Sequence, residues 1–361
     1  MSGVQTIRVG DDDGDQRLDR WLKKKFPQLT QGAVEKMCRT GQLRVDGGRV
    51  KASTRIEAGQ EVRVPPLPDP APANATGVPG RSVPAAASDA RSGITDSDER
   101  MIQDAVLWKD QHIIALNKPP GLPSQGGSGQ GDRHIDGLST ALMFGYKDRP
   151  KLVHRLDKDT SGVLLLARTD RVARALSEAF RSRRTRKIYW AAVAGLPNPR
   201  MGTIRYGLVK APGHGTGGGG EKMIAIHPRD IDATEGAKRA TTDYAVLEAL
   251  GTRASWCALV PITGRTHQLR AHMAELGHPI IGDGKYGGSG QENKGDGWGA
   301  QLGGEISRKL HLHARSLTFD HPITGERMTL TAPLPDHMTR TWHQLGWQES
   351  DVPADPFAEE T

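Results

Sequence analysis

The 361-residue chain lacks three features that would direct it into a membrane, an organelle or an oxidising compartment. It contains no run of 18 apolar residues, which excludes a membrane-spanning helix. Its first residues, "MSGVQTIRVGDDDGDQ", have no apolar signal core, and their acidic character argues against an organelle transit peptide. The two cysteines, Cys38 and Cys257, fall in what we interpret as separate domains, which argues against a disulfide framework. We therefore expect a cytoplasmic protein.

The chain also lacks the sequence signatures of nucleotide cofactors and catalytic metals. Two glycine-rich stretches, 211–223 and 286–305, contain neither G-x-x-x-x-G-K-[ST] nor a G-x-G-x-x-G that opens a helix, so we interpret them as loops. Five histidines match neither H-x-x-x-H nor H-E-x-x-H, and no cysteine or carboxylate cluster completes a site; they are His267, His272, His278, His311 and His313. We expect no metal and no cofactor.

The formal net charge of +7 has a location near the N-terminus. Between Gln16 and Val64 there are twelve Lys and Arg against five Asp and Glu, and 12 − 5 gives +7 for this segment alone. A small unit that carries the whole excess suits binding to a polyanion such as nucleic acid. On charge alone, a solvated charged surface is an equal alternative.

The same basic segment has the pattern of a small folded domain. The stretch "RLDRWLKKKF" places Leu18, Trp21 and Leu22 on one helical face, and Thr30 is an N-cap for a second helix that ends at Gly41. Short strands follow in "GQLRVDGGRVK" and "IEAGQEVRVP". Two helices followed by small strands, rich in Arg and Lys, resemble the S4 (αL-type) RNA-binding domain. That resemblance implies RNA contacts from residues 1–65, by Arg17, Arg20, Lys23, Lys24, Lys36, Arg39 and Arg44.

A second, larger domain follows a region rich in Pro and Ala. We interpret residues 66–101 as a linker, 102–345 as the second domain and 346–361 as a tail. Strand patterns occur at 105–118, 151–156, 162–168, 186–195, 241–250, 255–262 and 314–319, and helical patterns at 136–146, 171–182 and 266–277. The mixture predicts an α+β domain with a mixed, largely antiparallel sheet flanked by helices.

Four blocks of the second domain are more polar than the apolar patterns around them: 117–125, 154–162, 186–195 and 264–287. They contain "HRLDKDTSG", "KIYWAAVAG" and "GRTHQLR" in that order. Together they resemble the pseudouridine synthases of the RluA/RluC/RluD type, whose signature is H-R-L-D-x-x-T-S-G. The resemblance runs from about Ala105 to Leu334 and includes "LHLHARSLTFDHPITGE". It implies an isomerase that moves uracil from its N1–C1′ bond to a C5–C1′ bond, without a cofactor.

Two aspartates stand in the turn between two strand patterns, and the resemblance separates their roles. It makes Asp157 the carboxylate that attacks C1′ or removes a C2′ proton, the choice being open. Asp159 is then interpreted as a turn residue that caps backbone amides. A buried carboxylate needs a cation to stay ionised. The resemblance assigns that cation to Arg265, with Arg270 as its rival.

Further contacts with the substrate are expected around these residues. By resemblance, Tyr189 stacks on the uracil and serves as the base at C5 or relays to it, while Trp190 points to the opposite face of the strand and into the core. Contacts with the target nucleotide are assigned to His154, Arg155, Thr160, His267 and Arg270. The basic run "RSRRTRK" is expected to contact RNA phosphates through Arg183, Arg184 and Lys187.

An S4 domain joined to this catalytic domain points to the branch of the RluC type, which acts on large-subunit ribosomal RNA. We therefore expect a monomeric 23S rRNA pseudouridine synthase whose partner is that RNA or the pre-ribosomal large subunit, with no membrane. Transfer RNA or another rRNA site is one alternative substrate. A non-catalytic RNA-binding or ribosome-assembly factor is a second alternative, against which the three residues Asp157, Tyr189 and Arg265 argue.

Overall fold

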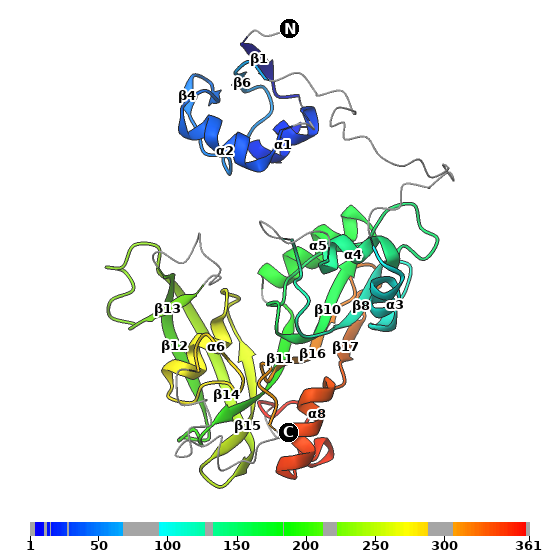
Figure 1. The fold of residues 1–361 in the computed structure, drawn as a ribbon, viewed down its shortest axis with the longest axis vertical. Helices are drawn as coiled ribbons and strands as arrows, with labels where there is room; N and C mark the ends of the chain where they lie inside the picture. The colour runs from blue at the N-terminus through cyan, green and yellow to red at the C-terminus, as the bar shows by residue number, and fades with distance from the viewer. Residues whose placement is uncertain are drawn as a thin grey trace, which may run out of the picture. The chain divides into compact units, whose positions relative to one another are not determined.

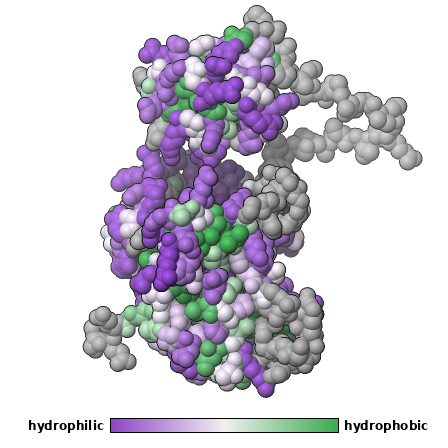
Figure 2. Space-filling view, turned by 90° about the vertical axis from the view of Figure 1, so that its left-hand side faces the viewer, coloured by the Kyte–Doolittle hydropathy of each residue, from purple (hydrophilic) through white to green (hydrophobic). Residues whose placement is uncertain are grey.

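The structure is a computed structural model, and it describes residues 4–10, 13–14, 16–26, 29–67, 94–126, 133–182, 184–211, 222–287 and 306–358. The chain divides into two compact units, Met1–Ala87 and Ser88–Thr361, which are described separately (Figure 1). Among the described residues, no helix is both long and apolar enough to cross a membrane. Figure 2 shows a face on which hydrophilic side chains prevail and apolar ones form small patches.

The N-terminal unit has its own apolar core. Leu18, Trp21 and Leu22 on α1 are fully buried, as their helical spacing predicts. The hydroxyl of Thr30 accepts a hydrogen bond from the amide of Ala33 and so caps α2, as predicted. A four-stranded sheet of order β1-β6-β3-β4 covers the helices. The elements are β1 Gln5–Arg8, β2 Gln16–Arg17, α1 Leu18–Lys25, α2 Gln31–Arg39, β3 Arg44–Val45, β4 Gly48–Arg49, β5 Arg55–Ile56 and β6 Glu61–Val64.

The second unit is built on one large sheet of order β13-β12-β14-β15-β11-β16-β10-β8-β7, with β17 paired to β16 and β9 to β10. β10 and β16 run parallel, and the other described pairs are antiparallel, which confirms the predicted mixed sheet. The strands are β7 Val106–Lys109, β8 Ile113–Lys118, β9 Lys151–Leu152, β10 Ser161–Ala167, β11 Arg186–Ala194, β12 Met201–Lys210, β13 Met223–Ile226, β14 Lys238–Leu250, β15 Ala254–Pro261, β16 Leu312–Asp320 and β17 Arg327–Thr331.

Helices cover the two halves of this sheet separately. Figure 1 shows α3, α4 and α5 beside β8 and β10 in one half, and α6 beside β12 and β13 in the other, with β11 and β16 between them. Side chains from both halves can therefore meet beside the central strands β11 and β16. The helices are α3 Asp96–Asp104, α4 Ile135–Leu138, η2 Ser139–Leu142, α5 Asp170–Arg181, α6 Gln268–Glu275, α8 Asp336–Leu345 and η4 Glu349–Asp351.

Two predicted boundaries differ from the structure. Helix α3 begins at Asp96, inside the segment interpreted as linker, because Thr95 caps it and Ile102 is buried against the second unit. The segment interpreted as a tail packs onto the same unit. Trp347 is buried beside Trp256 in an aromatic cluster, and burial of this apolar surface holds the last residues on the unit.

Candidate active site

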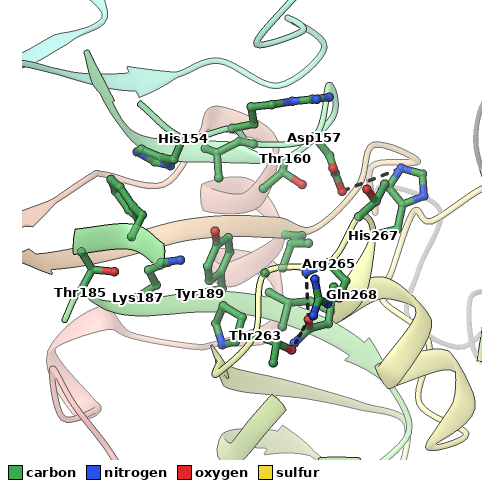
Figure 3. A pocket seen from close by; sticks show the side chains of 18 of the residues that line it. His154, Asp157, Thr160, Thr185, Lys187, Tyr189, Thr263, Arg265, His267 and Gln268 are labelled. Carbon is green, nitrogen blue, oxygen red and sulfur yellow. Dashed lines mark hydrogen bonds and ion pairs between the residues drawn. The ribbon is translucent and has the colours of Figure 1, made fainter. Parts of the chain in front are cut away.

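Asp157 lies in the loop between β9 and β10, and the segment that follows β8 holds this loop on both sides of it. The ammonium of Lys118 donates a 2.9 Å hydrogen bond to the carbonyl of Lys158. The hydroxyl of Ser124 donates to the carbonyl of Leu156 at 2.7 Å and accepts from its amide at 3.1 Å. The backbone before and after Asp157 is therefore fixed, which aims its carboxylate into the adjoining cavity (Figure 3).

Lys118 is fully buried, and its role was not predicted from the sequence. Besides Lys158, the carbonyls of Pro119 and Leu122 accept from its ammonium, each at 2.8 Å. Burial lowers the pKa of Lys118 to about 7. The negative charges of Asp159 and Asp157 act in the opposite direction but are the smaller effect. The signal was present, since Lys118 and Ser124 both lie in the polar block 117–125.

The turn that carries Asp157 is closed differently from the prediction. The amide of Thr160 donates to the carbonyl of Asp157 at 3.2 Å. Asp159, which was expected to cap amides here, is exposed, and no hydrogen bond to its carboxylate is present in the described part of the chain. Asp159 thus acts on the site through charge alone, by favouring the ammonium of Lys118.

The cation that faces Asp157 is Arg270, which corrects the assignment of this role to Arg265. The nearest guanidinium nitrogen of Arg270 lies 4.0 Å from the carboxylate of Asp157, and its other nitrogens donate two 2.7 Å bonds to Asp283. Arg265 is exposed at the rim of the cavity, where its Nε donates to the carbonyl of Arg239 at 3.4 Å. The reason is the start of α6 at Gln268: Arg270 is in its first turn and points inward, while Arg265 precedes it.

The loop before α6 is tied to the first residue of that helix. The side-chain oxygen of Gln268 accepts from the hydroxyl of Thr263 at 2.7 Å and from the amide of Arg265 at 3.1 Å (Figure 3). Gln268 also donates to the carbonyl of Thr241 at 2.8 Å. The segment "GRTHQLR" is therefore held against β14 at the place where it meets Asp157.

His267 is the second group close to Asp157. Its Nε2 lies 3.9 Å from the carboxylate, and its backbone has a left-handed φ of 50° at the N-cap of α6. Left-handed backbone is uncommon outside glycine and is often found at functional sites. This left-handed backbone places the imidazole between α6 and Asp157.

The contact with Tyr286 bears on which imidazole nitrogen of His267 carries the proton. The hydroxyl of Tyr286 lies 3.0 Å from Nδ1, and it already accepts a 2.8 Å hydrogen bond from the amide of Met223. We assign the proton of this phenol to the contact with Nδ1, and this assignment puts the ring proton on Nε2, the nitrogen that faces Asp157. Burial lowers the pKa of His267, so the ring is neutral at pH 7, and its Nε2 lies near the carboxylate at 3.9 Å, which is longer than a hydrogen bond.

Tyr189 projects from β11 into the same cavity, and its neighbour Trp190 lies in the core on the other face, as predicted. Trp190 packs edge-on against Trp256, with 4.6 Å between the ring centroids. Burial, with the nearby charge of Asp157, raises the pKa of Tyr189 above its usual range. The phenol therefore keeps its proton at neutral pH.

One cavity of about 800 Å³ brings together the predicted catalytic and substrate-binding residues of the second unit. Its walls include His154, Arg155, Asp157, Thr160, Lys187, Tyr189, Arg265, His267 and Arg270. Two hydroxyls in its walls, those of Thr160 and Thr185, are buried without a hydrogen-bond partner in the described ranges. Buried hydroxyls are normally paired, so these two are candidates to bind a ligand.

His154 holds neighbouring elements of the cavity wall together. Its Nε2 accepts from the amide of Leu165 at 3.0 Å, and its ring stacks on Phe180 with 4.2 Å between centroids. Burial lowers its pKa to about 3, so the ring is neutral. Its contact with substrate stays a prediction, as does that of exposed Arg155.

The remaining predicted RNA contacts fall in the basic run before β11 and in the N-terminal unit. Arg184 is exposed beside the cavity, and Arg183 lies outside the described residues. In the N-terminal unit Arg44 donates to the carbonyls of Gly41 and Gly47, so its guanidinium stabilises the neighbouring turns. The other basic residues are exposed on α1, α2 and just before α1: Arg17, Arg20, Lys23, Lys24, Lys36 and Arg39.

The histidines considered as metal ligands have other partners. Imidazole nitrogens lie within hydrogen-bond distance of the hydroxyls of Thr242, Thr341 and Ser161, for His272, His311 and His313 respectively. Within the described residues, no group of three or more His, Cys, Asp or Glu is arranged to hold a metal ion.

Comparison with known proteins gives two matching families. Residues 112–275 match the model of the RNA pseudouridylate synthases, and residues 16–62 match the S4 domain. The ribosomal large subunit pseudouridine synthase C of Escherichia coli strain K12 is 32% identical over 352 residues, 95% of this chain and 97% of that protein. The protein of that name from Rickettsia typhi is 34% identical, over 90% of this chain and 95% of its own length. Human RNA Pseudouridylate Synthase Domain Containing 4 has a similar structure, with a TM-score of 0.55 and 30% identity over 69% of this chain and 95% of that one.

Proposed function

The chain belongs to the RNA pseudouridylate synthase family, and from that premise we propose that it converts uridines of 23S ribosomal RNA into pseudouridines. The observation that carries the proposal is Asp157, which faces Arg270 and His267 in the cavity that Tyr189 also lines. The 23S target is supported by the relatives, which are named for the large ribosomal subunit and cover almost the whole chain.

The reaction breaks one bond to C1′ and makes another. The N1–C1′ bond of the uridine is cleaved, the detached uracil turns within the cavity, and C5 bonds to C1′ while its proton is lost and N1 gains one. Atoms and electrons balance without a redox partner. Asp157 either attacks C1′ or removes a proton from C2′, and both routes need an ionised carboxylate.

Arg270 and His267 supply the electrostatic conditions for that carboxylate. Arg270 carries a permanent positive charge, and Asp283 fixes its orientation through two hydrogen bonds. Neutral His267 adds an N–H dipole 3.9 Å from the carboxylate, without a second charge. Tyr189 offers a ring face for the uracil and, because its phenol stays protonated, moves the C5 proton by relay: it accepts one proton as it passes its own on.

The target base has to leave its helix to reach Asp157. Flipping costs a few kcal/mol, and phosphate contacts outside the cavity offset that cost. The basic N-terminal unit and Arg184, which is exposed beside the cavity, are suited to those contacts. We further propose that the protein acts as a monomer in the cytoplasm, without a metal or nucleotide cofactor.

The test is a map of pseudouridines in total RNA from cells with and without this protein. We expect loss of specific pseudouridines in 23S rRNA, restored by the wild-type chain and not by Asp157→Asn. Loss confined to transfer RNA or 16S rRNA would move the substrate to that RNA. An unchanged map, together with a ribosome-assembly defect, would favour a non-catalytic RNA-binding factor.

A further inference from the structure

Lys187 is a cation that the chemistry described above does not use. It projects from β11 into the cavity, two residues before Tyr189, and is half-buried there. Its ammonium lies 5.1 Å from the ring centroid of Phe180. In the ranges that the structure describes, no carboxylate lies within 4.0 Å of it and no atom accepts a hydrogen bond from it. Burial accordingly lowers its pKa.

Thr185 presents an unused donor at the same end of the cavity. Its hydroxyl is buried and unpaired within the described part of the chain. Figure 3 shows Thr185 and Lys187 together, with Tyr189 between them and Asp157. A half-buried ammonium and a buried hydroxyl, both without an acceptor, imply that the occupied cavity supplies one.

We propose that Thr185 and Lys187 form a subsite for one phosphodiester group of the RNA, next to the flipped uridine. This inference rests on the proposed function and adds the position of the strand in the cavity. A phosphate offers an anion to the ammonium and a separate oxygen to the hydroxyl. The uracil carbonyls are neutral and leave the buried charge of Lys187 uncompensated.

The proposal also says on which side of Tyr189 two groups of the bound RNA lie. In Figure 3, Tyr189 stands between the subsite and Asp157, so the bound phosphate lies on the Lys187 side of Tyr189 and C1′ on the Asp157 side. Lys187 and Thr185 are thereby binding residues that set how far the nucleotide enters. They take no proton and form no bond in the reaction.

The test combines protein variants with RNA in which single phosphates are neutral. A fragment that the wild-type protein modifies is prepared with one methylphosphonate at each position flanking the target uridine. Binding is measured at equilibrium for the wild type, for Lys187→Met and Thr185→Val, and for Lys187→Arg, which keeps the charge. The matched control is Arg171→Ala, which removes an exposed cation of α5 outside the cavity.

We expect one methylphosphonate to weaken wild-type binding by about tenfold, the value of one charged hydrogen bond. Lys187→Met should be insensitive to that same substitution, with a log–log salt slope reduced by about 0.7. Lys187→Arg and Arg171→Ala should keep the wild-type sensitivity, and Thr185→Val should lose part of it. Equal sensitivity of the wild type and Lys187→Met to every methylphosphonate would overturn the subsite. So would a Lys187→Met variant that binds normally and loses only turnover. Absence of wild-type turnover on any rRNA fragment would count against the proposed function instead.

Discussion

Arg270 grips Asp283 through two hydrogen bonds of 2.7 Å, and both side chains are buried. The pair is more than a structural link, because the third nitrogen of the same guanidinium is directed at Asp157 from 4.0 Å. Asp283 therefore orients the guanidinium of Arg270, and Asp157 lies beside its positive charge. In the proposed reaction this arrangement sets a positive charge beside Asp157 without locking the carboxylate in a short ion pair.

Replacement of Arg270 should damage catalysis far more than replacement of Arg265. Arg270→Lys keeps a charge but loses the two-pronged grip on Asp283, so we expect single-turnover rates to fall by about a hundredfold. Arg265→Lys should stay within a few fold of wild type. Thermal unfolding should show a lower Tm for the first variant alone. The opposite ranking in rate would restore the role that the sequence interpretation gave to Arg265.

Asp157→Asn should abolish isomerisation and leave RNA binding within a few fold. The amide matches the carboxylate in size but is neither nucleophile nor base, so residual turnover should lie below about a hundredth of wild type. Tritium release from C5-labelled uridine in RNA measures the turnover. Asp159→Asn is the control and should keep most of the activity, since its side chain is exposed. If the two variants exchange behaviours, the wrong aspartate has been named.

Tyr189→Phe should stop the reaction after the glycosidic bond has been engaged. The ring still stacks on the uracil, but the hydroxyl that relays the C5 proton is lost. Quenched reactions should contain rearranged product or adduct that remains bound, while tritium release is absent. A Phe variant with full activity would reduce Tyr189 to a packing residue.

Tyr286→Phe should make activity depend on pH in a way that the wild type does not. Without the phenol, Nδ1 of His267 loses its donor, and the ring is free to turn its unprotonated Nε2 toward Asp157. Protonation restores a donor at both nitrogens, and burial lowers the pKa of His267 below its usual value of about 6.5, so the activity of the variant should rise only as pH falls below about 6.5. The wild type should show no such rise, because its Nε2 already carries a proton.

Single-turnover pH–rate profiles of Tyr286→Phe and wild type provide the measurement. Tyr146→Phe, which alters an exposed tyrosine outside the cavity, is the control and should follow the wild type. Parallel profiles for all three proteins would show that the contact between Tyr286 and His267 only stabilises the fold.

The positions of residues that depend on a local sequence pattern could be predicted from the sequence. Alternation in β11 put Tyr189 and Trp190 on opposite faces, and the turn before β10 put Asp157 just ahead of a buried strand. The sequence was insufficient where a position depends on distant contacts. The choice between Arg265 and Arg270 follows from where α6 starts, and that start depends on Gln268 bonding to β14.

Other differences have similar causes. The helical pattern at 136–146 yields only α4 and the short 3-10 segment η2, and left-handed Phe144 and Gly145 end the helical backbone there. Strands β12, β13 and β17 were not predicted, and each lies beside partners that supply its hydrogen bonds. Their form is decided by the sheet more than by their own residues.

The basic N-terminal unit should contribute affinity and not the integrity of the catalytic unit. Its buried core is formed by residues between Val9 and Val64, and the apolar clusters around the cavity contain none of them. Deletion of residues 1–65 should therefore leave the Tm of the remainder nearly unchanged. RNA affinity should fall, and the log–log salt slope should decrease by about 0.7 to 0.9 for each phosphate contact that is lost.

The same deletion should affect long structured substrates most. A short single-stranded RNA presents its uridine nearly free to flip, whereas a folded rRNA fragment needs extra binding energy to do so. kcat/KM is measured for full-length and truncated protein on both substrates, and the loss should be larger on the long fragment. An equal loss on both, with an unchanged salt slope and a lower Tm, would mean that the unit supports the catalytic fold. In that case its twelve Lys and Arg would be a solvated surface, the alternative that charge alone leaves open.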